Sequence, residues 1–269
     1  MEEKYLNNKN NIYYRINNRF SKKPTLFFVH GVSGSSSAWK NYEKKFMHQY
    51  NIVSMDLRGH GKSFRPKKID EYQIKHFASD ILSIINKEKL KNIVLISHSF
   101  GNFPVLEFLK KHQKDIIGLI LVSPDCNPAK TKIAKLTNRL LITMPFINFI
   151  LGNKKTKGHV DYKYYYGTGD WNLRRTYADV KNTGLKSFLN SLMQSYSWNG
   201  EDVLDKIKVP VLIVHGEKDT IFPVEGGKYI AKEIKEAKLI ILKKANHIVV
   251  LNFFKELSGI IDKFVKELN

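Results

Sequence analysis

The stretch "VLISHSFGN", residues Val94–Asn102, joins an apolar run to an abrupt polar break. The residues two before and two after Ser99 are Ser97 and Gly101, and both are small. A tight turn from a strand into a helix requires small residues at these two places, because the strand and the helix approach each other closely there. The pattern therefore predicts an elbow that presents Ser99 as a nucleophile at the carboxyl end of a buried strand, rather than an exposed polar cap.

Short apolar runs rich in β-branched residues alternate with helix-like segments along the chain. Such runs are typical of strands buried on both faces, so an α/β fold with a mostly parallel sheet and helices on both faces is expected. The opening segment predicts an antiparallel edge hairpin around Asn7–Asn11. The expected strands are Thr25–His30, Ile52–Asp56, Asn92–Ser97, Gly118–Ser123, Val209–His215 and Lys238–Leu242, and the expected helices are Ser36–His48, Ile74–Lys87, Phe100–Lys111, Val224–Ile234 and Val249–Leu268.

One long segment interrupts the alternation. Residues 125–199 contain helical patterns but no strand-like run, so we expect a helical lid inserted into a core formed by residues 1–124 and 200–269. The lid contains an apolar stretch, Leu140–Leu151, and an aromatic-rich stretch, Asp161–Trp171. Membrane attachment is one interpretation. Folding over a pocket is favoured, because Pro145 and Gly152 interrupt the apolar stretch.

A serine hydroxyl needs a base, and the base needs a carboxylate that fixes its tautomer. His247 lies in a loop after the last strand-like run, and Asp219 directly follows a buried strand. The order Ser99, Asp219, His247 is the order of Ser, Asp and His in α/β-hydrolases. Asp125 also follows a strand and is an alternative acid. Asp56 ends a strand too, but the glycine-rich turn after it favours a structural role.

An oxyanion forms when a serine attacks an acyl carbon, and it needs N–H donors. The main-chain N–H of Phe100, directly after the nucleophile, is one expected donor. Val32, in "FFVHGVSGSS", is the other, because Gly31 and Gly34 allow this loop to approach closely.

The sequence resembles the α/β-hydrolase superfamily, in its lid-bearing branch. The matching stretches are "HGVSGSSSAW", "DLRGHGKS", "SHSFG", "VPVLIVHGEKDTIFP" and "ANH", and they cover residues 25–125 and 202 to the C-terminus. The resemblance implies that the residues after His-Gly and after the nucleophile, Val32 and Phe100, supply the oxyanion hole. Two residues depart from the family pattern: Ser97 replaces a glycine, and Asn102 stands where a second glycine is frequent. A serine nucleophile argues against the family's dehalogenases and epoxide hydrolases.

The expected function is hydrolysis of a carboxylic ester, or a related acyl compound, of a small-to-medium apolar substrate through an acyl-serine intermediate. A ligand-binding receptor with a hydrolase-like pocket is the alternative from another class. Lactonase, thioesterase, peptidase, carbon–carbon hydrolase and cofactor-free perhydrolase activities also remain open, because the fold alone does not define the substrate.

The composition argues against several other classes of protein. The formal net charge is +20, but the lysines are scattered and the abundant residue types have AT-rich codons, so we expect no nucleic-acid partner. Because the chain starts with polar residues and its apolar runs are short, we expect no signal peptide and no stable membrane anchor. A single cysteine, Cys126, excludes an intrachain disulfide and favours the cytoplasm. No cofactor or metal is expected.

Overall fold

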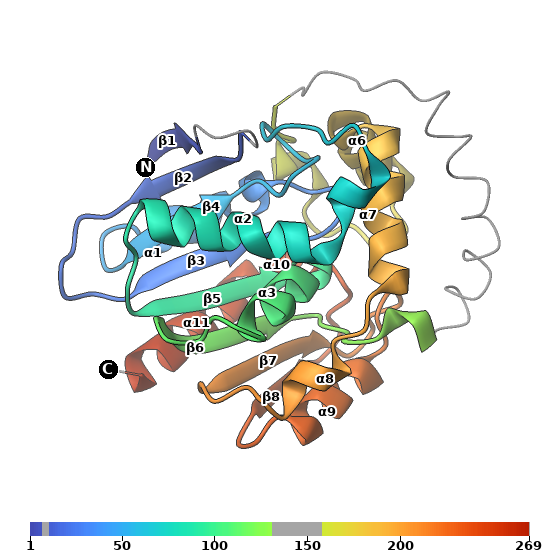
Figure 1. The fold of residues 1–269 in the computed structure, drawn as a ribbon. Coiled ribbons are helices and arrows are strands. Elements are labelled where there is room, and N and C mark those ends of the chain that lie inside the picture. The colour runs from blue at the N-terminus through green and yellow to red at the C-terminus, as the bar shows by residue number, and fades with distance from the viewer. Residues whose placement is uncertain (7–10, 131–157, 269) are drawn as a thin grey trace.

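The computed structural model describes residues 1–6, 11–130 and 158–268 of the chain. Eight strands form one sheet in the order β1-β2-β4-β3-β5-β6-β7-β8 (Figure 1). The first two are antiparallel to their neighbours, and all other pairs are parallel. The strands are β1 (Glu2–Tyr5), β2 (Tyr13–Asn17), β3 (Thr25–Val29), β4 (Asn51–Met55), β5 (Ile93–His98), β6 (Ile116–Val122), β7 (Val211–Gly216) and β8 (Lys238–Leu242).

The predicted mostly parallel α/β sheet is confirmed, and the six expected core strands are all present with ends moved by at most two residues. The predicted hairpin is the antiparallel pair β1–β2 at the sheet edge, although turn residues 7–10 lie outside the described part of the chain. Five consecutive residues of β3 are fully buried, which explains why a continuous apolar run marks this strand.

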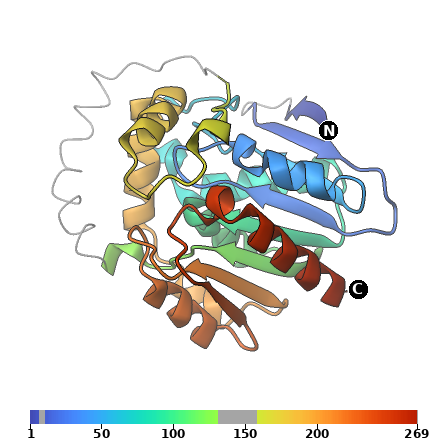
Figure 2. The same cartoon turned by 180° about the vertical axis from the view of Figure 1, so that it is seen from behind.

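Helices cover both faces of the sheet and bury two apolar clusters against it. Helices α2 and α3 cover one face (Figure 1), and α1 and α11 cover the other, which is seen from behind in Figure 2. The expected C-terminal helix is divided at Phe253, whose backbone is not helical. The helices outside residues 125–199 are α1 (Lys40–Phe46), α2 (Ile74–Lys87), α3 (Asn102–Leu109), α8 (Glu201–Leu204), α9 (Val224–Glu233), α10 (Val249–Asn252) and α11 (Phe254–Glu267).

We call residues 125–199 the insertion; its described residues, 125–130 and 158–199, lie beyond the carboxyl ends of the parallel strands (Figure 1). These described residues contain two α-helices, α6 (Leu173–Thr183) and α7 (Leu185–Ser197), two short 3₁₀ helices, and no strand. The apolar stretch Leu140–Leu151 lies outside the described residues. Within the described residues, no helix is long and apolar enough to cross a membrane.

Candidate active site

The turn between β5 and α3 holds Ser99 in a strained backbone conformation. Its φ is 53°, in the left-handed region that residues other than glycine rarely adopt. Gly101 then passes so close to β3 that an added Cβ would lie 2.6 Å from the carbonyl oxygen of His30 and 2.9 Å from that of Val29. Only glycine fits there, and the strained turn lifts Ser99 above the end of the sheet.

The two departures from the family pattern are bonded to each other. Ser97 Oγ donates a hydrogen bond of 2.6 Å to Asn102 Oδ1, and Asn102 Nδ2 donates one of 3.1 Å to the carbonyl oxygen of Val122. Both side chains are fully buried. The added bulk at the elbow is therefore accommodated by a hydrogen-bonded pair that ties α3 to strands β5 and β6.

Hydrogen bonds link the three residues of the predicted triad in the order Ser99, His247, Asp219. His247 Nε2 is 2.7 Å from Ser99 Oγ, and His247 Nδ1 is 2.8 Å from Asp219 Oδ2. All three side chains are buried. With the proton on Nδ1, the imidazole donates to the carboxylate and presents the lone pair of Nε2 to the hydroxyl, which is the arrangement that a base requires.

Asp219 has further donors that fix its orientation. The main-chain N–H groups of Ile221 and Phe222 donate to Oδ1 at 2.9 and 2.8 Å. A second histidine, His215, has its Nε2 3.3 Å from Oδ2. Burial opposes ionisation of Asp219, but the hydrogen bonds from His215 and His247 hold the pKa of this carboxyl well below its usual range.

The alternative acid, Asp125, is not bonded to His247. Its Oδ1 accepts a hydrogen bond of 2.7 Å from the main-chain N–H of Asn127, two residues further on. Burial raises the pKa of this carboxyl, whereas that of Asp219 is lowered. The geometry therefore favours Asp219 as the partner of the histidine.

The two expected oxyanion donors line the same cavity as Ser99. His30 Nδ1 donates to the carbonyl oxygen of Gly31 at 2.7 Å, and its Nε2 accepts from the main-chain N–H of Leu57 at 3.0 Å. Burial lowers the pKa of His30 to about 4, so the ring is neutral at physiological pH. In a trans peptide the C=O and N–H point in opposite directions, so the bond to Gly31 also fixes where the N–H of Val32 points.

The cavity at Ser99 has a volume of about 350 Å³, and described residues of the insertion form part of its lining. Apolar side chains form much of its wall, including Phe188 and Leu192 from α7 and Phe222 from the core. Buried polar groups also line it: Tyr162 Oη donates to Asp179 Oδ1 at 2.8 Å. Among the described residues, no group of three or more His, Cys, Asp or Glu side chains is placed to hold a metal ion.

Sequence reasoning missed several residues that hold this site in place. His215 lies in the stretch that identified Asp219, and its position at the end of a buried strand was an available signal. His98 directly precedes the nucleophile, and its Nε2 donates to the carbonyl oxygen of His247 at 2.9 Å. Asp170 comes from the insertion, where no pattern indicated a role.

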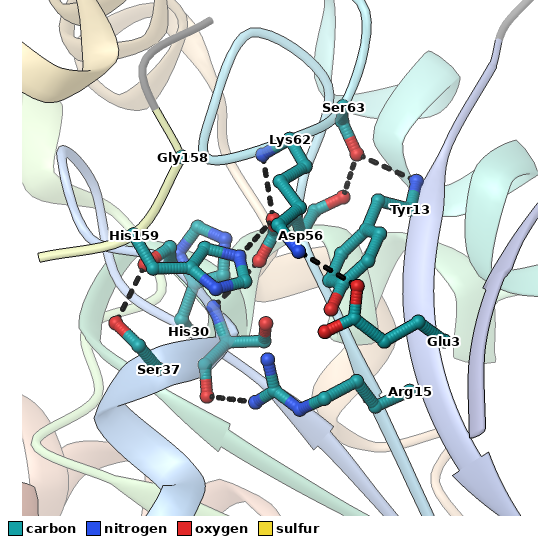
Figure 3. A network of polar contacts seen from close by, with 12 residues as sticks. Glu3, Tyr13, Arg15, His30, Ser37, Asp56, Lys62, Ser63, Gly158 and His159 are labelled. Carbon is teal, nitrogen blue, oxygen red and sulfur yellow. Dashed lines mark hydrogen bonds and ion pairs between the residues drawn. The ribbon is translucent and has the colours of Figure 1, made fainter. Parts of the chain in front are cut away.

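Asp56 does not join the triad and instead organises a buried polar network (Figure 3). Its Oδ1 accepts from the main-chain N–H of Ser36 at 2.7 Å, and its Oδ2 accepts from the main-chain N–H of Lys62 at 2.7 Å. His159, from the insertion, has its Nε2 2.7 Å from the same Oδ2. Burial opposes ionisation of Asp56, but its hydrogen bond with His159 contributes most to lowering its pKa to about 2. The network attaches the insertion to the core.

A serine, a histidine and an aspartate at the carboxyl edge of a mostly parallel sheet are characteristic of the α/β-hydrolases as a class. Residues 24–253 match the family model described as the alpha/beta hydrolase fold, and the chain belongs to this family.

The names of proteins similar to this chain indicate several different activities. The chain is 28% identical over 245 residues to the proline iminopeptidase PfmaB of Pestalotiopsis fici, covering 84% of this chain and 86% of that protein. It is 26% identical over 229 residues to the bifunctional esterase/perhydrolase DCH of Acinetobacter calcoaceticus, covering 81% and 82%. Mouse protein ABHD8 is 26% identical over 246 residues, which is 89% of this chain but only 54% of ABHD8, so the chain spans about half of that relative.

A solved structure, that of a hydrolase from Pseudomonas aeruginosa, superposes with a TM-score of 0.76 at 17% identity and covers 98% of both chains. At this identity the likeness establishes the fold alone.

Proposed function

We propose that the protein is a serine hydrolase that cleaves carboxylic esters of small-to-medium apolar acids through an acyl-serine intermediate. The observation that carries the proposal is the relay in which His247 lies 2.7 Å from Ser99 Oγ and 2.8 Å from Asp219 Oδ2. Membership in a family that includes a named esterase is consistent with it.

In the proposed reaction, Ser99 Oγ attacks the acyl carbon and its proton passes to His247 Nε2. The main-chain N–H groups of Val32 and Phe100 stabilise the oxyanion. His247 then donates the proton to the departing alcohol oxygen, and the acyl group remains on Ser99. A water molecule attacks the acyl-serine, its proton moves to His247 and on to Ser99, and the acid leaves. Throughout, Asp219 keeps the other ring proton on Nδ1.

The insertion is proposed to act as a lid that selects the acyl group. Its helix α7 contributes Phe188 and Leu192 to the cavity wall, and Tyr196 follows one turn later on the same lining. A cavity of about 350 Å³ with such walls accommodates a small or medium apolar group.

The test combines a panel of p-nitrophenyl esters, from acetate to palmitate, with labelling by a fluorophosphonate. We expect turnover of the shorter esters, labelling of Ser99, and a loss on the order of 10⁴-fold or more in the folded Ser99→Ala variant. A Ser99→Ala variant that kept about a tenth of the activity would contradict the assignment. A wild-type protein that neither hydrolyses nor becomes labelled would instead favour a binding protein with a hydrolase-like pocket.

A second candidate activity is hydrolysis of an aminoacyl amide. Asp179 places a carboxyl group in the cavity wall, where burial raises its pKa to about 6; its Oδ2 lies 3.7 Å from Arg175 Nη1, so an amine would compete with this guanidinium for the ionised carboxylate. One relative is named as a proline iminopeptidase. Turnover of proline p-nitroanilide faster than of p-nitrophenyl butyrate would support this candidate over the esterase.

A further inference from the structure

Asp170, from the insertion, lies between the two loops that carry the predicted acid and base. Its Oδ1 accepts a hydrogen bond of 2.8 Å from the main-chain N–H of His247. Its Oδ2 accepts hydrogen bonds from Thr220, at 3.0 Å from the main-chain N–H and at 2.7 Å from Oγ1. Thr220 directly follows Asp219. One carboxylate therefore joins the base of the triad to the residue next to its acid.

Neighbouring hydrogen bonds hold this part of the insertion on the same two loops. On the acid loop, Trp171 Nε1 donates to Thr220 Oγ1 at 3.0 Å. On the histidine side, Asn246 Nδ2 and Asn252 Nδ2 both donate to the carbonyl oxygen of Thr168, at 3.0 and 2.9 Å. Segment 168–171 is thus bonded on either side of Asp170, so the position of its carboxylate is fixed.

The hydrogen bond that the N–H of His247 donates to Asp170 is one of several that hold the main chain of His247. The carbonyl oxygen of His247 already accepts from His98 Nε2 at 2.9 Å and from Ser123 Oγ at 3.4 Å. Asp170 holds the N–H of the same residue. Both peptide groups that flank the histidine Cα are therefore anchored. A misplacement of about 1 Å at a reacting group can reduce a rate on the order of 100-fold, so this anchoring bears directly on catalysis.

We propose that Asp170 is a positioning residue for the reaction: its carboxylate sets the placement of His247 relative to the Asp219 loop. The inference rests on the proposed function. Asp170 acts through His247 and Thr220, while Ser99, His247 and Asp219 perform the chemistry. The insertion then contributes to the geometry of the triad as well as to the wall of the cavity.

The chemistry of the site explains why a carboxylate is needed. Three donors converge on two oxygens, and two of these donors are main-chain N–H groups that cannot become acceptors. An asparagine at position 170 has one acceptor oxygen, so its NH₂ group would face a donor on one side. Asp170→Asn therefore breaks the connection between the loops while it preserves the size of the side chain.

Asp161 offers a matched control within the insertion. Its exposed carboxylate pairs with Lys163 at 3.1 Å and accepts from the main-chain N–H of the same residue. Asp161→Asn removes the same charge and retains an oxygen that can accept this bond. We expect Asp170→Asn to lower kcat about 10- to 100-fold with KM changed less than about threefold, and Asp161→Asn to leave both within about twofold of the wild type.

The rate constant for labelling of Ser99 by a fluorophosphonate is the second measurement. We expect it to fall in Asp170→Asn in parallel with kcat. Adding Thr220→Ala to Asp170→Asn should cost less than the sum of the two single effects, because both substitutions break the same bridge. Thermal unfolding of each variant confirms that the comparison is between folded proteins.

Two results would overturn the positioning role. The first is an Asp170→Asn variant equal to Asp161→Asn in kcat and in labelling rate. The second is a raised KM with unchanged kcat and labelling, which would make Asp170 a substrate-binding residue. If the wild type becomes labelled but hydrolyses no ester, the proposed ester substrate is wrong, and the labelling rates still test Asp170. If it does neither, the proposed function itself is wrong, and no reaction remains for Asp170 to serve.

Discussion

Replacing Asp219 with asparagine should reverse the tautomer of His247, the proposed base. Ile221 and Phe222 point main-chain N–H groups at Oδ1, at 2.9 and 2.8 Å, so the amide oxygen of the asparagine must take this position. The NH₂ group then occupies the position of Oδ2 and faces His247 Nδ1. In the opposite orientation the NH₂ group would face the N–H groups of Ile221 and Phe222, and a main-chain N–H can only donate. The imidazole of His247 can instead move its proton from one ring nitrogen to the other.

The consequence is a histidine that cannot act as a base. With Nδ1 accepting from the asparagine, the ring proton moves to Nε2, which lies 2.7 Å from Ser99 Oγ. The proton then occupies the lone pair that should receive the serine proton. The expected loss in kcat is on the order of 10⁴-fold, or about 5.4 kcal/mol of transition-state stabilisation, because a wrong tautomer removes general-base catalysis while the geometry is preserved.

Asp125→Asn is the matched comparison, because Asp125 is also buried and follows the neighbouring strand β6. Its carboxylate bonds to Asn127 and not to His247, so kcat should change less than about threefold. The assay is steady-state hydrolysis of a p-nitrophenyl ester, with thermal unfolding as the control for folding. If Asp125→Asn lost more activity than Asp219→Asn, with both folded, the acid would be Asp125 and the tautomer argument would be wrong.

Three further predictions concern stability. His159→Ala removes one hydrogen bond to the buried carboxylate of Asp56 and should lower the free energy of unfolding by about 1.5–3 kcal/mol, measured by urea denaturation; an unchanged midpoint would contradict it. The pKa of Asp56 is lowered to about 2 in the folded state, so its contribution to stability is present above about pH 4 and lost as the pH falls toward 2. Asp56→Asn should make the urea midpoint less dependent on pH in this range, and an equally steep dependence would count against it. Gly101→Ala would place a Cβ 2.6 Å from the carbonyl oxygen of His30 and should cost about 1–3 kcal/mol, seen as a lower Tm; a Tm equal to that of the wild type would show that the elbow has more space than the structure indicates.

The sheet and the three residues of the relay could be predicted because their signals are local. A strand buried on both faces needs a continuous apolar run, and the carboxyl ends of parallel strands meet at one edge. Residues that follow such runs, as Ser99 and Asp219 do, are therefore brought together by topology alone. Which of two aspartates reaches His247 is decided by loop conformation, and the sequence left that choice open.

Two supporting residues of the insertion, Asp170 and His159, could not be predicted because they act across long sequence separations. Asp170 bonds to residues 50 and 77 positions away, and His159 to one 103 positions away. No periodicity links an insertion to the loops that it contacts. The pairing of Ser97 with Asn102 was hidden for a different reason: each residue was considered as added bulk, and only the structure shows that the two side chains satisfy each other.

The insertion contacts the core on both sides of the cavity, and this bears on how its variants should be interpreted. Near the oxyanion loop, Thr183 Oγ1 donates to the carbonyl oxygen of Ser33, directly after Val32, at 2.7 Å. Near the histidine loop, Asp170 holds the N–H of His247. A side chain that only lines the cavity, such as Phe188, would contact the acyl group of the proposed substrate, so its replacement should mainly change KM and chain-length preference. Replacement of a residue that is hydrogen-bonded to the loop of Val32 or of His247 should instead lower kcat. Variants of the insertion should therefore fall into two groups: those that change substrate selection, and those that change the alignment of the proposed triad.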